Sequence, residues 1–80
     1  MTQEQQTQLH DLCMRCVRED KKDQMKGYLA EAMQKYEAGE FTKKYLTDMG
    51  MRMLAIVQLG RMTEFISSAK KLAAEMDFQI

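Results

Sequence analysis

Apolar residues recur every three or four positions along most of the chain, which is the spacing of one face of an α-helix. The first such set lies within residues 9–17, and a second lies within residues 25–36. In one straight helix these two sets would lie far apart around the helix axis, so they cannot share a single buried face. The polar run at 18–24 therefore predicts a turn between two helices.

Local signals mark the ends of these two helices. Thr2 and Gln5 have the spacing of a capping box, so we expect the first helix to run from about Gln3 to about Glu19. Gly39 is a natural residue just beyond the end of the second helix. The part of the chain before Phe41 is thus predicted to form an N-terminal helical hairpin.

The second half of the chain permits two arrangements. Thr42 is the expected N-cap of a third helix. We predict one long C-terminal helix from Thr42 to about Asp77, because a single row of apolar residues runs through almost its whole length. The alternative is four short helices with a break near Gly60, in which Thr63 begins the fourth. In both cases the fold class is all-α, and residues 1–80 make a single helical domain.

The row of apolar residues also predicts an interface. Its steps of three and four residues average close to the 3.5-residue spacing of a helix–helix seam. It lies opposite the face that the long helix would turn toward the hairpin, and a domain of this size cannot bury both faces of one helix. We therefore predict self-association, with a symmetric homodimer as the commonest closed form. The predicted interface residues are Met51, Ala55, Leu59, Met62, Ile66, Ala69, Ala73 and Met76.

Composition supports the helical class and narrows the function. The 80 residues include no proline, and good helix formers are abundant. Twelve basic and twelve acidic residues give a formal net charge of zero, which argues against a dedicated binder of nucleic acid or anionic membranes. We see no internal repeat, no export signal and no uninterrupted apolar run long enough to span a membrane. Two cysteines without an export signal fit a reducing compartment, so we expect a cytoplasmic protein.

One short motif could carry metal or thiol chemistry. His10, Cys13 and Cys16 fall on one helical stripe, and imidazole and thiolate groups suit Zn²⁺. The chain contains no other histidine or cysteine, so a monomer cannot complete a tetrahedral site from these residue types. We predict no metal and no cofactor, with both cysteines as small apolar core residues. A metal- or thiol-sensing regulator is kept as an alternative function.

Two further classes of function have weaker signals. The sequence shows no general base and no oxyanion pocket placed beside a nucleophilic side chain, and it contains no Gly-rich phosphate loop. We therefore do not expect an enzyme. Lys43 and Lys44 begin the predicted third helix and would lie outward in a DNA-recognition helix. Because the net charge is zero, nucleic acid is not an expected partner, and a DNA-binding regulator is the third hypothesis.

The function predicted from the sequence is non-enzymatic. We expect a small helical protein–protein interaction module that self-associates and acts as an adaptor or regulator of a larger partner. Exposed contiguous apolar surface of the predicted extent usually marks such an interaction site.

Overall fold

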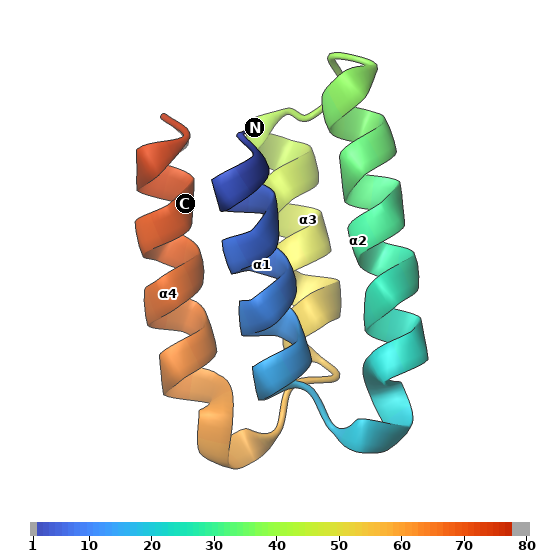
Figure 1. Cartoon of the computed structure of the whole chain (residues 1–80), viewed down its shortest axis with the longest axis vertical. Coiled ribbons are helices and arrows are strands. Elements are labelled where there is room, and N and C mark those ends of the chain that lie inside the picture. The colour runs from blue at the N-terminus through green and yellow to red at the C-terminus, as the bar shows by residue number, and fades with distance from the viewer. Residues whose placement is uncertain (1, 78–80) are drawn as a thin grey trace.

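The computed structural model describes residues 2–77, which fold into a bundle of four α-helices (Figure 1). In chain order these are α1 (Gln3–Cys16), α2 (Lys22–Glu37), α3 (Lys43–Leu54) and α4 (Met62–Glu75). Consecutive helices run in opposite directions, so that α1 and α2 form one hairpin and α3 and α4 form another (Figure 1). A short 3₁₀ turn precedes the second helix of each hairpin, at Glu19–Lys21 and at Leu59–Arg61. The all-α fold class is confirmed.

The predicted long C-terminal helix is wrong, and the alternative with a break near Gly60 is correct. Helix α3 ends at Leu54, and α4 begins at Met62 after a turn that contains Gly60. By folding back, α4 buries Phe65 and Leu72 within the bundle and packs along α1, its most extensive helix–helix contact. A straight helix would leave these large side chains in water, at a cost of roughly 2 kcal/mol for each.

The helix-end signals predicted at Thr2, Thr42 and Gly39 are present, whereas α4 begins at Met62, before Thr63, and has no side-chain cap. The hydroxyl of Thr2 accepts a hydrogen bond from the backbone N–H of Gln5 (3.1 Å), and the Gln5 side chain accepts one in return from the Thr2 N–H (3.0 Å). The hydroxyl of Thr42 likewise accepts from the N–H of Tyr45 (3.1 Å). Gly39 follows α2 with a positive φ of 74°, a conformation that favours glycine. These local signals were therefore interpreted correctly from sequence.

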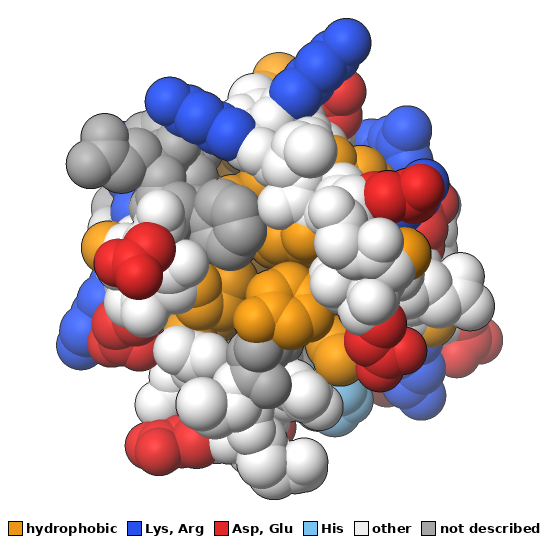
Figure 2. Space-filling view, turned by 90° about the horizontal axis from the view of Figure 1, so that it is seen from above, with side chains coloured by type: hydrophobic (Ala, Val, Ile, Leu, Met, Phe, Trp, Pro, Cys, Tyr) orange, Lys and Arg blue, Asp and Glu red, His pale blue; other side chains and the backbone are white. Residues whose placement is uncertain are grey.

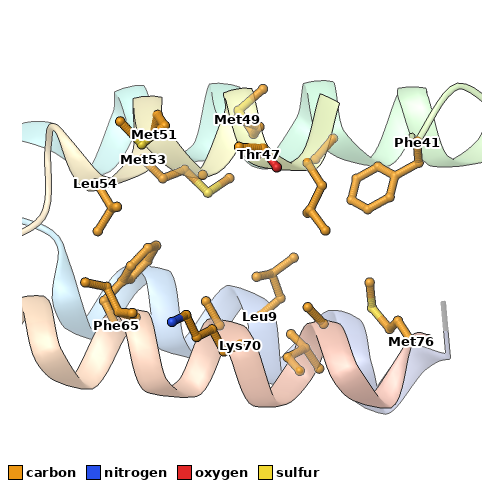
Figure 3. Close-up of a pocket in the computed structure, with 17 residues that line it drawn as sticks. Leu9, Phe41, Thr47, Met49, Met51, Met53, Leu54, Phe65, Lys70 and Met76 are labelled. Carbon is orange, nitrogen blue, oxygen red and sulfur yellow. The ribbon is translucent and has the colours of Figure 1, made fainter. Parts of the chain in front are cut away.

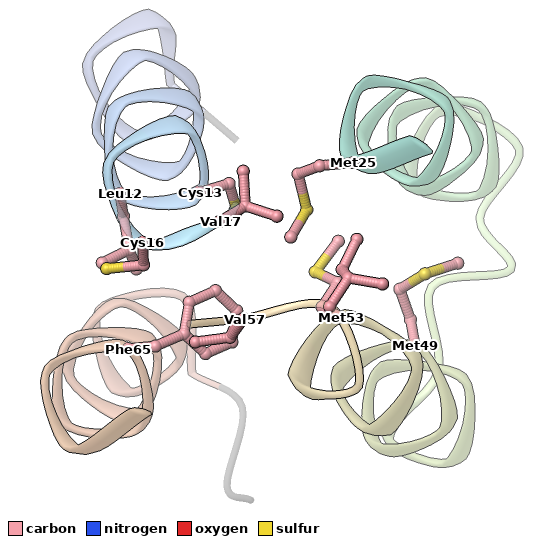
Figure 4. Packing of buried hydrophobic residues seen from close by; sticks show 10 residues of the cluster. Leu12, Cys13, Cys16, Val17, Met25, Met49, Met53, Val57 and Phe65 are labelled. Atoms are coloured by element: carbon pink, nitrogen blue, oxygen red, sulfur yellow. The ribbon is translucent and has the colours of Figure 1, made fainter. Parts of the chain in front are cut away.

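Buried side chains from all four helices and both turns meet at the centre of the bundle (Figure 4). Cys13, Cys16 and Met25 are the largest side chains that are fully removed from solvent. Methionine and cysteine pack irregular spaces easily because they are small or unbranched. The buried cluster consists of Leu12, Cys13, Cys16, Val17, Met25, Met49, Met53, Ile56, Val57 and Phe65.

The two hairpins repeat the same local structure, with Thr2 of the first corresponding to Thr42 of the second. Both threonines are N-caps. The backbone of Arg18 (φ −64°, ψ 147°) matches that of Gln58 (φ −62°, ψ 134°), and each residue precedes a 3₁₀ turn. Most buried core positions also correspond: Cys13 with Met53, Cys16 with Ile56, Val17 with Val57, Met25 with Phe65, and Ala32 with Leu72, whereas the equivalents of Leu12, Met49 and Ala73 are not buried.

No repeat was recognised in the sequence, because the two halves preserve burial rather than residue identity. Between residues 2–37 and residues 42–77 the paired residues are identical only at Thr2 and Thr42, at Thr7 and Thr47, and at Val17 and Val57. Each hairpin is therefore an internal reference for the other. Where equivalent positions carry different residue types, the local backbone geometry does not explain the difference, because it is the same in both hairpins.

The two ends of the bundle differ. At one end the turns of the hairpins are joined by an isolated antiparallel β-bridge between Val17 and Val57. The backbone N–H of Gln58 adds a hydrogen bond to the carbonyl of Cys16 (3.0 Å). At the opposite end, where α3 begins and α4 ends, hydrophobic side chains are visible between the helix ends (Figure 2). The two hairpin turns are thus joined by backbone hydrogen bonds at one end of the bundle. At the other end, which we call the open end, apolar side chains are exposed between the helix ends.

Candidate functional site

An apolar groove lies between α3 and α4 and reaches into the open end of the bundle (Figure 3). Its volume is about 230 Å³. The floor includes Leu9 of α1 and Ala32 of α2, and Phe41 lies at the open end. The α3 wall consists of Leu46, Thr47, Met49, Gly50, Met51, Met53 and Leu54, and the α4 wall consists of Phe65, Ile66, Ala69, Lys70, Leu72, Ala73 and Met76.

The antiparallel course of α3 and α4 places side chains from the two walls opposite one another. Leu54 lies across from Phe65 at the turn end, and Phe41 lies across from Met76 at the open end (Figure 3). At 1.5 Å per residue, the lined part of α3 is about 12 Å long and that of α4 about 16 Å. The groove therefore has the length of two to three turns of an α-helix.

The chemistry of the groove is almost wholly apolar. Among the described residues that line it, only Thr47 and Lys70 have polar side chains. Methionine side chains are flexible and polarisable, and they are over-used on surfaces that adapt to protein partners. The lining methionines are Met49, Met51, Met53 and Met76.

The structure brings five of the eight predicted interface residues into this groove: Met51, Ile66, Ala69, Ala73 and Met76. The other three, Ala55, Leu59 and Met62, lie around the turn between α3 and α4 and do not line it. Met51 is 65% exposed and Leu59 is 87% exposed, whereas Ala73 is buried. Because the helix is broken, the predicted row is not one straight seam. It runs along α3, around the turn and back along α4.

Comparison with the first hairpin shows that the local backbone does not demand an apolar residue at every position of this row, although Met62 also packs against the core cluster. In the internal repeat, Met51 is equivalent to Asp11, and Ile66 is equivalent to Lys26. At five consecutive positions of the row, the first hairpin carries a charged residue and the second an apolar one. We call the apolar set the outer stripe; its members and their equivalents are Met51 and Asp11, Ala55 and Arg15, Leu59 and Glu19, Met62 and Lys22, and Ile66 and Lys26.

The first hairpin also contains a counterpart of the groove. Seven of the eight residues that line a surface depression between α1 and α2 are equivalent to residues that line the α3–α4 groove. In that depression Gln6 and His10 occupy the positions of Leu46 and Gly50. The same backbone arrangement therefore has a mixed polar and apolar lining in the first hairpin and an almost wholly apolar lining in the second.

The charges at the α3–α4 groove are basic. Lys70 lies in its α4 wall, and Lys43 and Lys44 lie in the first turn of α3. Each of these lysines is exposed, and none of the three makes an ion pair within residues 2–77. By contrast, Arg52, on the side of α3 that faces α2, lies 3.5 Å from the carboxylate of Glu31. The lysines at the groove are thus available to an acidic ligand.

Sequence reasoning missed part of the groove. Leu46, Met49, Met53 and Lys70 line it but are not among the predicted interface residues. Met49 and Met53 are buried, yet they also line the groove, because α4 packs closely on α1 and leaves space beside α3. The position of Lys70, four residues after Ile66, was the available signal, since residues four apart share a helix face.

The His10, Cys13 and Cys16 stripe does not converge as a ligand set. The side chain of His10 is 57% exposed and its Nδ1 lies 3.6 Å from the carboxylate of Asp11. Cys13 and Cys16 are fully buried in the core. Within residues 2–77 no three histidine, cysteine or acidic side chains are grouped so that they could hold a metal ion.

The buried thiols are poor nucleophiles and poor metal ligands at neutral pH. Burial, together with a smaller contribution from the neighbouring Cys16, raises the pKa of Cys13 from 9.0 to about 12. Burial is also the main cause of the raised pKa of Cys16. Reactive or metal-binding cysteines need an accessible thiolate, which both environments disfavour.

No known protein family matches the chain, and no curated protein or solved structure is significantly similar to it. None of the helices formed by residues 2–77 has the length and apolar character needed to cross a membrane. The features of the chain that bear on its function are therefore the groove, the outer stripe and the charges around them.

Proposed function

We propose that this chain is a non-enzymatic protein–protein interaction module that acts as an adaptor or regulator of a larger partner. Its contact surface is the α3–α4 groove together with the outer stripe. We propose that the apolar face of a partner's α-helix occupies the groove, a common mode of peptide recognition.

The observation that supports this proposal most directly is the difference between the two hairpins. The fold accommodates Asp11 and Lys26 in the first hairpin, where the second carries Met51 and Ile66. Placing apolar side chains in water gains nothing for an isolated domain, whereas the same side chains stabilise a complex when a partner removes them from water.

Self-association through the same surface is the second part of the proposal. In the absence of a partner, two copies would cover one another's outer stripes in a symmetric dimer. A partner helix and a second copy would then compete for one surface. This competition would couple the oligomeric state of the chain to partner binding.

The two other regulator hypotheses have less support. A metal- or thiol-sensing role needs accessible ligands, but Cys13 and Cys16 are buried while His10 is exposed beside Asp11. A DNA-binding role would use Lys43 and Lys44, which lie beside an apolar groove rather than on a continuous basic face.

The proposal is tested by quantitative affinity purification from the native host, followed by reconstitution with each purified candidate partner. The test variant is Ile66→Glu, on the α4 wall of the groove. The matched control is Lys26→Glu, which introduces the same side chain at the equivalent exposed position of the first hairpin. We expect a specific partner to bind the wild type and the control, and to bind the Ile66→Glu variant at least tenfold more weakly.

Circular dichroism of both variants establishes that they remain folded. A partner that binds the Ile66→Glu variant as tightly as the wild type would contradict the proposed surface. The same conclusion would follow if only the Lys26→Glu variant lost the partner.

A further inference from the structure

We propose that the partner helix in the α3–α4 groove is acidic: its apolar stripe is flanked by aspartate or glutamate side chains that lie against Lys70, Lys43 and Lys44. This inference rests on the proposed function, since it names the partner class of the same groove. It comes from the charges at the groove, which are independent of the apolar contacts.

The groove dimensions suit a short helix. Lined lengths of about 12 Å on α3 and about 16 Å on α4 correspond to two or three helical turns. A helix with apolar residues at positions i, i+3, i+4 and i+7 presents a stripe of this length. Met51 and Ile66, on opposite walls, would lie on either side of that stripe.

Basic side chains lie on both of the helices that form the groove. Among the described residues, Lys70 is the only charged one that lines the groove. On α3, Lys43 is four residues before the lining residue Thr47, and Lys44 is seven residues before Met51, so each shares a helix face with a lining residue. None of the three lysines makes an ion pair within residues 2–77. A bound apolar stripe would therefore have unpaired cations along both sides.

The acidic side chains on these two helices lie outside the groove lining, as Lys43 and Lys44 do. Asp48 on α3 and Glu75 on α4 are exposed and do not line the groove. Glu64 is held by Arg15 of α1 (2.7 Å) and by Arg61 (2.9 Å). Asp77, just beyond α4, is exposed and also outside the lining. Within the described lining the charge is thus that of Lys70, which is positive although the whole chain is neutral.

The same charges favour a different protein over a second copy as the tighter occupant. A symmetric dimer would bring two basic rims together, and like charges repel. An acidic helix offers the same apolar contact with attraction in place of repulsion. Self-association should therefore strengthen with added salt, because salt screens repulsion, whereas binding of an acidic helix should weaken.

Three synthetic peptides of equal length, each long enough for at least three helical turns, test the inference. All have the same leucine stripe with helical spacing. Their flanking positions carry glutamate in the first peptide, lysine in the second and glutamine in the third. Dissociation constants are measured by fluorescence anisotropy at low and high salt, and the helicity of each free peptide is measured by circular dichroism, so that affinities can be corrected for helix formation.

We expect the glutamate peptide to bind roughly tenfold more tightly than the lysine peptide at low salt, with the glutamine peptide between them. High salt should reduce the difference in affinity between the glutamate and lysine peptides. The Lys70→Glu variant should lose or invert the preference. The matched control is Lys71→Glu, the adjacent exposed lysine, which lies on the side of α4 that faces α1 and should leave the preference unchanged.

The outcomes separate this inference from the proposed function. Binding of all three peptides with equal affinity, lost in the Met51→Glu variant, would overturn the acidic preference and leave the groove as a helix-binding site. Failure of every peptide to bind the monomeric protein would contradict both. A dimer that Met51→Glu dissociates and that no peptide displaces would identify a second copy as the occupant, which would also overturn the inference.

Discussion

Val17 and Val57 pair as an isolated antiparallel β-bridge that joins the turn of one helical hairpin to the turn of the other. The two residues occupy equivalent positions within the internal repeat. Both side chains are buried in the central cluster. The bridge fixes the closed end of the bundle, from which α3 and α4 extend as the two walls of the groove.

Shortening either valine should destabilise the whole bundle. Val17→Ala and Val57→Ala each remove two buried methyl groups and leave a cavity, so each should lower the free energy of unfolding by about 2 kcal/mol. Equilibrium unfolding in urea measures both values. Costs below roughly 0.5 kcal/mol would show that the bridge does not anchor the two turns, because this range is typical of surface substitutions.

Two methionines within one turn of α3, Met49 and Met51, should respond differently to the same change. Met51→Asp places at this exposed position the residue type of its equivalent, Asp11, and should alter the free energy of unfolding by no more than about 0.5 kcal/mol. Met49→Asp buries an unpaired carboxylate at a position that is 2% exposed, and should cost about 3 kcal/mol or more. Urea unfolding compares the two variants. If both variants lost the same free energy of unfolding, Met51 would belong to the internal core as Met49 does, which would contradict its assignment to the outer stripe.

The stability of the bundle should fall in alkaline solution because of its buried thiols. The pKa of Cys13 is about 12 in the folded state against an ordinary value of 9.0, so the unfolded chain loses this proton first as pH rises. The stabilising contribution is complete below about pH 9 and is lost progressively as pH rises toward 12.

The measurement is the urea midpoint at pH 7 and at pH 10.5, for the wild type and for Cys13→Ala. Titration of other groups affects both proteins, so the difference between them reports on Cys13. We expect the wild type to lose more stability than the variant over this interval. Equal losses would show that the thiol titrates normally in the folded chain.

The ion pairs of Glu64 should stabilise the contact between α1 and α4 in a pH-dependent manner. Hydrogen bonds from Arg61 and then from Arg15 lower the pKa of Glu64. Because the pKa is lowered in the folded state, the ionised carboxylate stabilises the fold at pH values above its ordinary pKa of 4.5. This contribution is lost as pH falls through the lower pKa of the folded state. Glu64→Gln should therefore lower the urea midpoint at pH 7 and have a smaller effect at pH 3. An effect of equal size at both pH values would rule out a contribution from the carboxylate charge.

Helix ends and the first hairpin could be predicted from sequence because they depend on neighbouring residues. Thr2, Thr42 and Gly39 act through contacts within a few positions, and their roles in the structure match the prediction. The end of the first helix was placed at Glu19, yet α1 ends at Cys16. The difference arises because the next residue, Val17, leaves the helix to pair with Val57 in the second hairpin.

The break between α3 and α4 could not be settled from local patterns. The steps from Met51 to Met76 match a continuous seam, and the same residues also fit two helices folded together. The deciding contribution is the burial of Phe65 and Leu72 when α4 packs along α1, which depends on segments distant in sequence. For the same reason the groove was predicted only in part: Ile66, Ala69, Ala73 and Met76 of its α4 wall were identified, while Phe65, Lys70 and Leu72 were not.

The most direct test of the α3–α4 groove as the interaction surface is a chemical-shift map of the isotopically labelled protein during titration with the glutamate-flanked peptide. The internal repeat supplies the reference positions within the same molecule. We predict large shift changes at Met51, Ile66 and Lys70, with little change at their equivalents in the first hairpin, which are Asp11, Lys26 and Ala30. Equal changes on both hairpins, or changes confined to α1 and α2, would contradict the account.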